Sequence, residues 1–133
     1  MYVFDLTMAA GCATRKDAAE ILSSSGFPQS EGHLLSAILP ELAKLLVEKG
    51  YSRKEASNKL IHLISTYQTE DATLYIYACF IFGQSEFTFS ECVTLAYCYE
   101  TGDVTPAFAN KDLLNACLEK VYRFVVPGER DPD

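Results

Sequence analysis

The stretch LLVEKGYSRKEASNKLIHLI, residues Leu45–Ile64, predicts a helix, a turn and a second helix. Gly50 is typical of a helix end, because glycine takes a positive φ at no steric cost. Ser52 and Glu55 follow with the spacing of a capping box, which satisfies free N–H groups at the start of a helix. Apolar residues then continue at helical spacing, namely Ala56, Leu60, Leu63, Ile64 and Tyr67. The stretch therefore predicts a tight helical hairpin.

Similar start and end signals divide the whole chain into six or seven short helices. The expected ranges are 2–10, 15–25, 31–49, 53–67, 70–82, 89–100 and 111–125. Pro40 is expected to kink or split the third helix near residues 36–39, because proline lacks an N–H and clashes with the preceding turn. The predicted fold class is all-α, a compact single-domain bundle over residues 1–126, with a frayed acidic tail at 127–133.

Capping residues support several of these boundaries. Thr88 and Glu91 repeat the capping-box spacing, and Thr14 also has an acidic residue three positions later. Thr69 and Asn110 precede acidic residues, which are favourable in a first turn because they meet the positive end of the helix dipole. Glycines are expected just past five helix ends: Gly11, Gly26, Gly50, Gly83 and Gly102.

The last predicted helix carries the clearest amphipathic pattern. Its apolar residues recur with a period near 3.6. They are Leu113, Leu114, Cys117, Leu118, Val121, Phe124 and Val125. This stripe predicts that Leu114, Leu118 and Val121 are almost fully buried.

Residues 72–99 leave an alternative open. They are rich in residue types that prefer strands, and Gly83–Glu86 has the composition of a hairpin turn. Two helices are favoured, because polar and apolar residues do not alternate and the caps are well formed. Phe87 and Cys92 also stand where a hydrophobic staple packs around a helix start at Thr88. The alternative fold is α+β, with a hairpin at about 72–99.

The composition is typical of one folded globular domain. The 133 residues are 49% hydrophobic and 22% charged, which excludes a largely disordered chain. The formal net charge of -7 disfavours nucleic acids and anionic membranes as partners. The longest apolar run, Leu74–Phe82, is too short to span a membrane. The N-terminal stretch lacks the basic start of a signal peptide, and Asp5 interrupts its apolar residues.

The cysteines favour a reducing compartment. There are five of them, Cys12, Cys79, Cys92, Cys98 and Cys117. Because their number is odd and most lie in apolar runs, we expect buried free thiols in a cytoplasmic protein. No CxxC pair occurs and the chain has only two histidines, so no metal site and no other cofactor is expected.

No motif in the sequence indicates a catalytic reaction. The patterns GxSxG and HExxH are absent, as is a glycine-rich phosphate loop. We expect His33 and His62 to have no catalytic role, and the protein not to be an enzyme. A small enzyme of unknown reaction remains an alternative, since a fold can assemble catalytic residues that lie far apart in the sequence.

The charge distribution is more informative than the total charge. Residues 1–67 carry seven basic and seven acidic side chains, so the rest of the chain carries the whole imbalance. No Lys or Arg occurs in residues 60–110. That window holds six acidic residues: Glu70, Asp71, Glu86, Glu91, Glu100 and Asp103.

The same window holds two Tyr-x-Tyr pairs, Tyr75 with Tyr77 and Tyr97 with Tyr99. On a helix, side chains two residues apart point about 200° away from each other. At least one tyrosine of each pair should therefore reach the rim or the surface.

An acidic surface that bears tyrosines predicts a protein-binding role. Aromatic side chains supply binding hot spots, and an acidic field attracts a basic partner. The expected partner-binding residues are Glu86, Glu91, Tyr97, Tyr99, Glu100 and Asp103. The expected function is a non-catalytic acidic binding protein that neutralises a basic protein partner, as an immunity or inhibitor protein against a nuclease-like toxin does. The alternative is an adaptor or scaffold domain that binds a helix or peptide in a groove, and self-association is also open.

Overall fold

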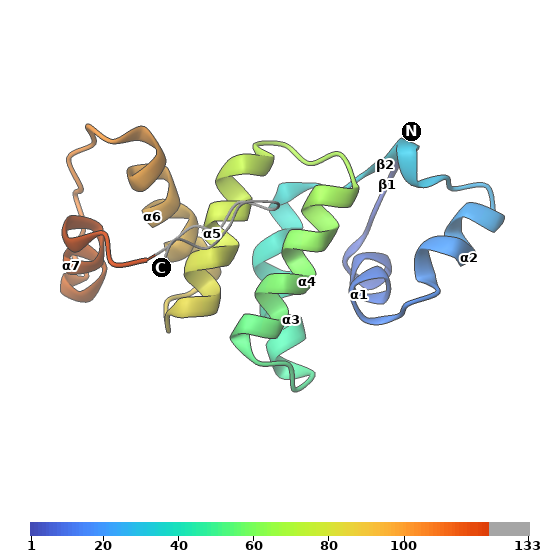
Figure 1. Ribbon diagram of the computed structural model, residues 1–133, viewed down its shortest axis with the longest axis horizontal. Coiled ribbons are helices and arrows are strands. Elements are labelled where there is room, and N and C mark those ends of the chain that lie inside the picture. The colour runs from blue at the N-terminus through green and yellow to red at the C-terminus, as the bar shows by residue number, and fades with distance from the viewer. Residues whose placement is uncertain (123–133) are drawn as a thin grey trace, which may run out of the picture.

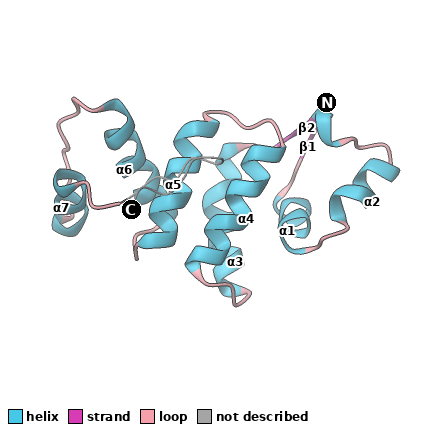
Figure 2. Cartoon of the chain, viewed as in Figure 1, coloured by secondary structure: helices cyan, strands magenta, loops and turns pink. Residues whose placement is uncertain are grey.

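The computed structural model describes residues 1–122, and helices, 3-10 turns included, make up 66% of these described residues (Figure 2). The helices are α1 Leu6–Thr14, α2 Ala18–Ser24, α3 Leu39–Glu48, α4 Arg53–Thr66, α5 Ala72–Gln84, α6 Phe89–Thr101 and α7 Lys111–Glu119. Two 3-10 turns, Gln29–Glu31 and Ser36–Ile38, and two short strands, β1 Tyr2–Val3 and β2 Gly32–His33, accompany them. The all-α prediction is confirmed, and the alternative hairpin at about 72–99 is wrong. The predicted tail at 127–133 lies outside the described residues.

The helices follow one another along the long axis of the molecule (Figure 1). α7 and α2 lie at its two ends, and α3 to α6 lie between them. α5 packs against both α4 and α6. This central position explains why α5 shows no alternation of polar and apolar residues, since both of its sides meet other helices.

The core runs through the middle of this row of helices. Its largest fully buried side chains are Leu34, Leu39, Leu42, Leu46, Leu60, Cys79, Ile81, Cys92 and Leu95. Burying one aliphatic side chain of this size contributes about 1.5–3 kcal/mol. Most of the stabilisation therefore lies in α3 to α6, and two of these helices, α5 and α6, also carry the candidate site.

Two capping boxes were predicted from the sequence and both are confirmed. The Ser52 hydroxyl accepts from the Glu55 backbone N–H, and the Glu55 carboxylate accepts from the Ser52 N–H. Thr88 and Glu91 make the same reciprocal pair at the start of α6. Asn110 also caps as predicted, because its side-chain oxygen accepts from the first-turn N–H groups of α7.

Two other predicted caps are wrong. Thr14 is the last residue of α1, and its hydroxyl donates to the carbonyl of Ala10 instead of capping α2. α2 begins only at Ala18. Thr69 does not cap α5 either, because that helix begins after Asp71, which has the left-handed φ of 51°.

Three of the five glycines lie at helix ends as predicted. Gly26, Gly50 and Gly102 have φ values of 93°, 104° and 86°, which only glycine adopts without strain. The prediction is wrong for Gly11 and Gly83, which lie inside α1 and α5.

Gly83 lies inside α5, at a point where α4 comes close to its backbone. A Cβ on Gly83 would stand 3.1 Å from the Cβ of Ser57. Ser57 is itself buried, and its hydroxyl donates to the carbonyl of Cys79 across the interface, with an O···O distance of 2.6 Å. The missing side chain therefore allows α4 and α5 to pack closely.

Residues 2–5 and 32–35 were predicted to be helical, and this is wrong. β1 and β2 pair in parallel, with Tyr2 opposite Gly32. Gln68, which follows α4, bridges to His33 on the other side of β2. The Pro40 prediction is confirmed, since α3 begins at Leu39 with the proline in its first turn, after a separate 3-10 turn.

Aromatic packing explains why the backbone is extended at these positions. The Phe4 ring makes edge-to-face contacts with Tyr2 and Tyr67, and Tyr2 makes another with Phe27. A Cβ on Gly32 would stand 2.7 Å from the Tyr67 ring. This cluster of aromatic side chains holds β1, β2 and the end of α4 together. A single helical turn at residues 2–5 would be less stable, because starting a helix is unfavourable.

The burial predicted for the last helix is wrong. Leu118 is 65% exposed and Val121 is 55% exposed, while Leu114 is half-buried. α7 is the terminal helix and packs against α6 through a narrower face, whose buried residues are Leu113, Ala116 and Cys117. It ends at Glu119, before the predicted end, and Phe124 and Val125 lie outside the described residues.

Candidate functional site

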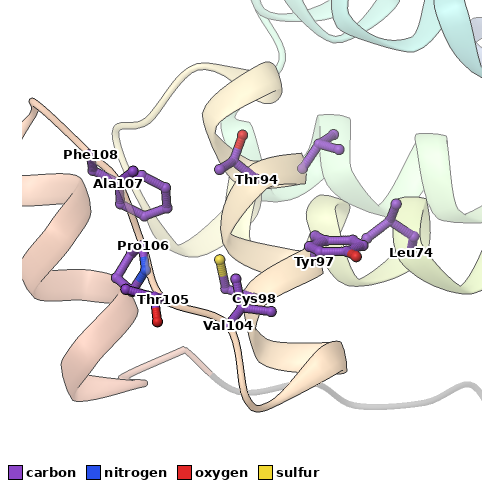
Figure 3. A pocket seen from close by; sticks show the side chains of 10 residues that line it. Leu74, Thr94, Tyr97, Cys98, Val104, Thr105, Pro106, Ala107 and Phe108 are labelled. Atoms are coloured by element: carbon purple, nitrogen blue, oxygen red, sulfur yellow. The ribbon is translucent and has the colours of Figure 1, made fainter.

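A hollow of about 370 Å³ lies between α6 and the irregular segment 104–108 (Figure 3). We call it the apolar groove. Its lining residues are Leu74, Val93, Thr94, Tyr97, Cys98, Val104, Thr105, Pro106, Ala107 and Phe108. Most of these side chains are apolar, none is charged, and both walls present carbon to the opening.

A second hollow of about 600 Å³ lies between the start of α5 and the end of α6. We call it the acidic hollow. It is lined by Asp71, Ala72, Thr73, Leu74, Tyr97, Glu100 and Thr101. Leu74 and Tyr97 line both hollows, so the two adjoin and form one depression that is apolar at one end and acidic at the other.

Tyr97 separates the two ends of this depression. It is 53% exposed, whereas Tyr99 is half-buried and its hydroxyl donates to the carbonyl of Ala116 in α7, at 2.5 Å. Burial raises the pKa of Tyr99 to about 12, so this hydroxyl keeps its proton at neutral pH. The prediction that one tyrosine of this pair reaches the surface is confirmed, since the period of the helix turns the two rings to opposite sides. Tyr75 and Tyr77 are both half-buried.

The structure brings together only some of the six predicted site residues. Tyr97 and Glu100 meet at the acidic hollow, and Asp103 is exposed just beyond the end of α6. Glu86 is exposed before the start of α6. α6 is about 20 Å long, so Glu86 lies far from the acidic hollow, which is near the other end of this helix.

Glu91 has a structural role that the sequence only partly indicated. One carboxylate oxygen accepts from the Thr88 N–H in the capping box, and the other accepts from the side chain of Asn110 at 3.3 Å. It therefore joins the starts of α6 and α7. Since both oxygens are engaged within the chain, Glu91 is less free than Glu100 to bind a partner.

Sequence reasoning missed part of the depression. Asp71 belonged to the acidic window but was interpreted as a helix-dipole residue. Val104 and Phe108 lie in a segment without helical spacing, so no periodic pattern marked them as a wall of the groove. The signal that was available is the apolar content of Val104–Phe108, a loop segment between two helices.

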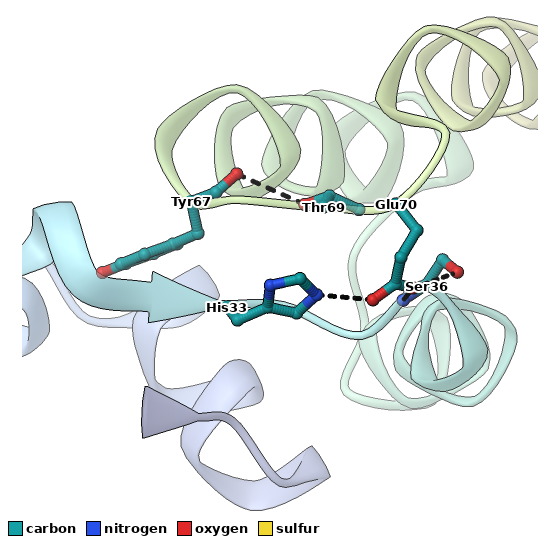
Figure 4. A network of polar contacts seen from close by, with 5 residues as sticks. All are labelled: His33, Ser36, Tyr67, Thr69 and Glu70. Carbon is teal, nitrogen blue, oxygen red and sulfur yellow. Dashed lines mark hydrogen bonds and ion pairs between the residues drawn. The ribbon is translucent and has the colours of Figure 1, made fainter. Parts of the chain in front are cut away.

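A second cluster of polar side chains surrounds Glu70 (Figure 4). The Nε2 atom of His33 lies 2.5 Å from Glu70 Oε1, while the backbone N–H and the hydroxyl of Ser36 donate to Oε2. The hydrogen bond from His33, followed by those from Ser36, lowers the pKa of the Glu70 carboxyl below its usual value. This cluster is not a hydrolytic triad, because in a triad the histidine lies between the serine and the acid.

The buried cysteines are poorly suited to nucleophilic chemistry. All five are free thiols; four of them are buried as predicted, whereas Cys12 is half-buried. Burial raises the pKa of Cys79 strongly and that of Cys92 to about 11, so both stay protonated at neutral pH. Within residues 1–122, no group of three His, Cys, Asp or Glu side chains is placed to hold a metal ion.

None of the helices in the described part of the chain is long and apolar enough to cross a membrane. No protein-family model, no curated protein and no solved structure matches this chain. The depression beside Tyr97 and the charges around it are the features of this chain that bear on its function.

Proposed function

We propose that this chain is a non-catalytic binding protein that takes a basic protein partner on the surface of α5 and α6. One observation carries the proposal: residues 60–110 contain no Lys or Arg, and this segment includes every residue that lines the surface depression beside Tyr97. The acidic side chains of this region therefore have no cation of their own segment to neutralise them.

Electrostatics and aromatic contact would act at different steps of binding. An acidic field raises the rate of encounter with a basic partner and disfavours acidic competitors. Tyr97 then supplies a large, half-exposed ring of the kind that dominates binding energy when a partner covers it. Neither role requires a reacting group, which agrees with the absence of catalytic motifs in the sequence.

The biological role that fits this surface is neutralisation of a basic toxin. Nuclease-like toxins need a positive cleft for phosphate groups, and an acidic protein that covers such a cleft blocks the substrate. The five free thiols support a cytoplasmic location, where thiols stay reduced.

A second candidate function is that of an adaptor which binds a helix or peptide. The apolar groove favours it, because a partner segment can be held there by apolar contact alone. The two functions differ in their dependence on salt. Association driven by the acidic field slows as salt screens it, whereas apolar contact is affected little.

The test compares three tagged forms of the chain in the cells of origin. The first is the natural chain, the second carries Glu86→Gln, Glu100→Gln and Asp103→Asn, and the third carries Glu20→Gln, Glu41→Gln and Glu48→Gln. The two variants lose the same charge, but the third form loses it from α2 and α3, which belong to the segment 1–67 with equal numbers of basic and acidic residues. We expect a basic protein to be captured and cross-linked by the first and third forms and not by the second.

The captured protein is then purified and its association rate measured at low and high salt. The proposal predicts slower association for the second form, with a difference that shrinks as salt rises. It is overturned if all three forms capture the same proteins equally. It is also overturned if the cross-links lie outside residues 68–108, or if they lie on an acidic surface of the partner.

A further inference from the structure

We propose that the depression beside Tyr97 binds a short segment of the partner that carries an apolar side chain next to a lysine or arginine. This inference rests on the proposed function and specifies which part of the partner is recognised. The apolar side chain enters the apolar groove, and the neighbouring cation lies over the acidic hollow.

The shape and lining of the groove fit an apolar anchor. Its volume of about 370 Å³ lies at the small end of the range for binding pockets in proteins. Val93 on α6 lines the groove together with Val104 and Phe108 of the irregular segment. A polar side chain placed here would lose its contacts with water and gain few hydrogen bonds in return. The groove therefore favours an apolar side chain of the partner.

The charges of the acidic hollow fit a cation. Asp71 stands at the start of α5 and Glu100 near the end of α6, so two helices bring the carboxylates to one depression. Both residues are exposed, and neither side chain forms a salt bridge with another described residue. No Lys or Arg lines either hollow. A partner's cation would therefore meet two carboxylates without displacing a cation of this chain.

Tyr97 determines the spacing between the two features of the partner. Its ring lines both hollows, so the anchor and the cation have to be neighbours or near neighbours along the bound segment. Its exposed ring also offers a surface over which an ammonium or guanidinium group can lie. One side chain thus contributes to both contacts, and its removal should weaken both.

Three synthetic peptides serve as probes for the isotopically labelled full chain in solution NMR. The first carries a central Leu-Phe pair flanked by two arginines on each side. The second replaces Leu-Phe with Ser-Ser, and the third replaces the arginines with glutamates. We expect only the first to bind at ~1 mM or below. Its shift changes should centre on Thr94, Tyr97 and Thr101.

Matched variants then separate the two contacts. Tyr97→Ala should weaken binding of the first peptide by ~10-fold or more. Glu100→Gln should weaken it by ~3-fold at low salt and less at high salt. The controls are Leu118→Ala, which truncates an exposed apolar residue on α7, and Glu48→Gln, which removes a charge from α3. Both should leave the affinity unchanged.

Each other outcome overturns a distinct part of the inference. Equal binding of the first two peptides, with shifts near Glu86, overturns the groove contact. The proposal that the chain binds a basic partner would be unaffected by that result. Binding that ignores the arginine-to-glutamate change overturns the basic partner and favours an adaptor. Failure of all three peptides overturns both. Concentration-dependent shifts of the groove residues without peptide would show that a second copy of the chain occupies the groove, which also overturns the inference.

Discussion

His33 and Glu70 are 37 residues apart in the sequence, yet the imidazole Nε2 of one lies 2.5 Å from a carboxylate oxygen of the other. The contact joins β2 to the linker between α4 and α5. Ser36 donates two hydrogen bonds to the second carboxylate oxygen, so Glu70 attaches the linker to both His33 and Ser36. Because Asp71 and the start of α5 follow directly, this contact also positions one wall of the acidic hollow.

The lowered pKa of Glu70 predicts a pH-dependent contribution to stability. The folded-state pKa lies below the unfolded value of ~4.3, so the folded state favours the ionised carboxylate. The stabilisation is fully present above the unfolded pKa and is lost as pH falls through the folded one. In urea unfolding from pH 7 to pH 3, the natural chain should lose more stability than Glu70→Gln does. Equal losses would contradict the assigned role of the carboxylate.

The capping box of α4 predicts the cost of removing Ser52. Ser52→Ala leaves the Glu55 N–H without its acceptor and should lower the free energy of unfolding by ~0.5–2 kcal/mol. Ser52→Asn should cost less, because asparagine also accepts hydrogen bonds as an N-cap. Chemical denaturation followed by circular dichroism measures both. A neutral Ser52→Ala would mean that water replaces the cap without loss.

Two glycines inside helices predict opposite effects of the same substitution. A Cβ on Gly11 meets nothing within 4 Å, so Gly11→Ala should stabilise the protein by ~0.5–1 kcal/mol through helix propensity. A Cβ on Gly83 meets Ser57 at 3.1 Å, and Ser57 is held by its own hydrogen bond. Gly83→Ala should therefore destabilise by ~1 kcal/mol or more. Thermal unfolding of the two variants side by side gives the signs, and stabilisation by both would show that α4 and α5 can move apart.

The helices were predictable from the sequence wherever their signals are local. The boxes at Ser52 and Thr88, and the break at Pro40, depend on residues within one or two turns, and all were correct. Contacts between distant segments were not predictable in this way. The partner of Glu70, His33, is 37 residues away. The sequence therefore suggested that the Glu70 carboxylate interacts with a helix dipole, whereas it contacts His33.

The candidate site was predictable to a similar extent. The helical period predicted that at least one of Tyr97 and Tyr99 reaches the surface, and the acidic window included Glu100. The structure shows that Tyr97 and Glu100 are exposed. The irregular segment that closes the groove has no period, and its position depends on how α7 packs against α6. Which side of α7 is buried also depends on that packing, and the apolar stripe alone did not indicate it.

The buried face of α7 predicts that truncating Leu113 destabilises the protein more than truncating Leu118, which the apolar stripe had marked as buried. Leu113→Ala should cost ~2 kcal/mol or more, because its side chain is buried against the core. Leu118→Ala should change stability by less than ~0.5 kcal/mol, because the residue is mostly exposed. Urea denaturation distinguishes them directly. A larger loss for Leu118→Ala than for Leu113→Ala would mean that another surface covers Leu118 in solution.

The two tyrosines of α6 should separate stability from binding. Tyr99→Phe removes the hydroxyl that donates to the carbonyl of Ala116 and should lower the free energy of unfolding by ~0.5–1.5 kcal/mol. Tyr97→Ala removes a half-exposed ring and should change stability by less than ~0.5 kcal/mol. Its effect should appear in binding, as faster dissociation from the partner or from the arginine-flanked Leu-Phe peptide, because the exposed part of the ring is covered only in the complex. Unfolding by urea and dissociation rates from surface plasmon resonance give the two readouts. Tyr97→Ala that loses stability without losing affinity would show that the ring supports the fold and does not contact the partner.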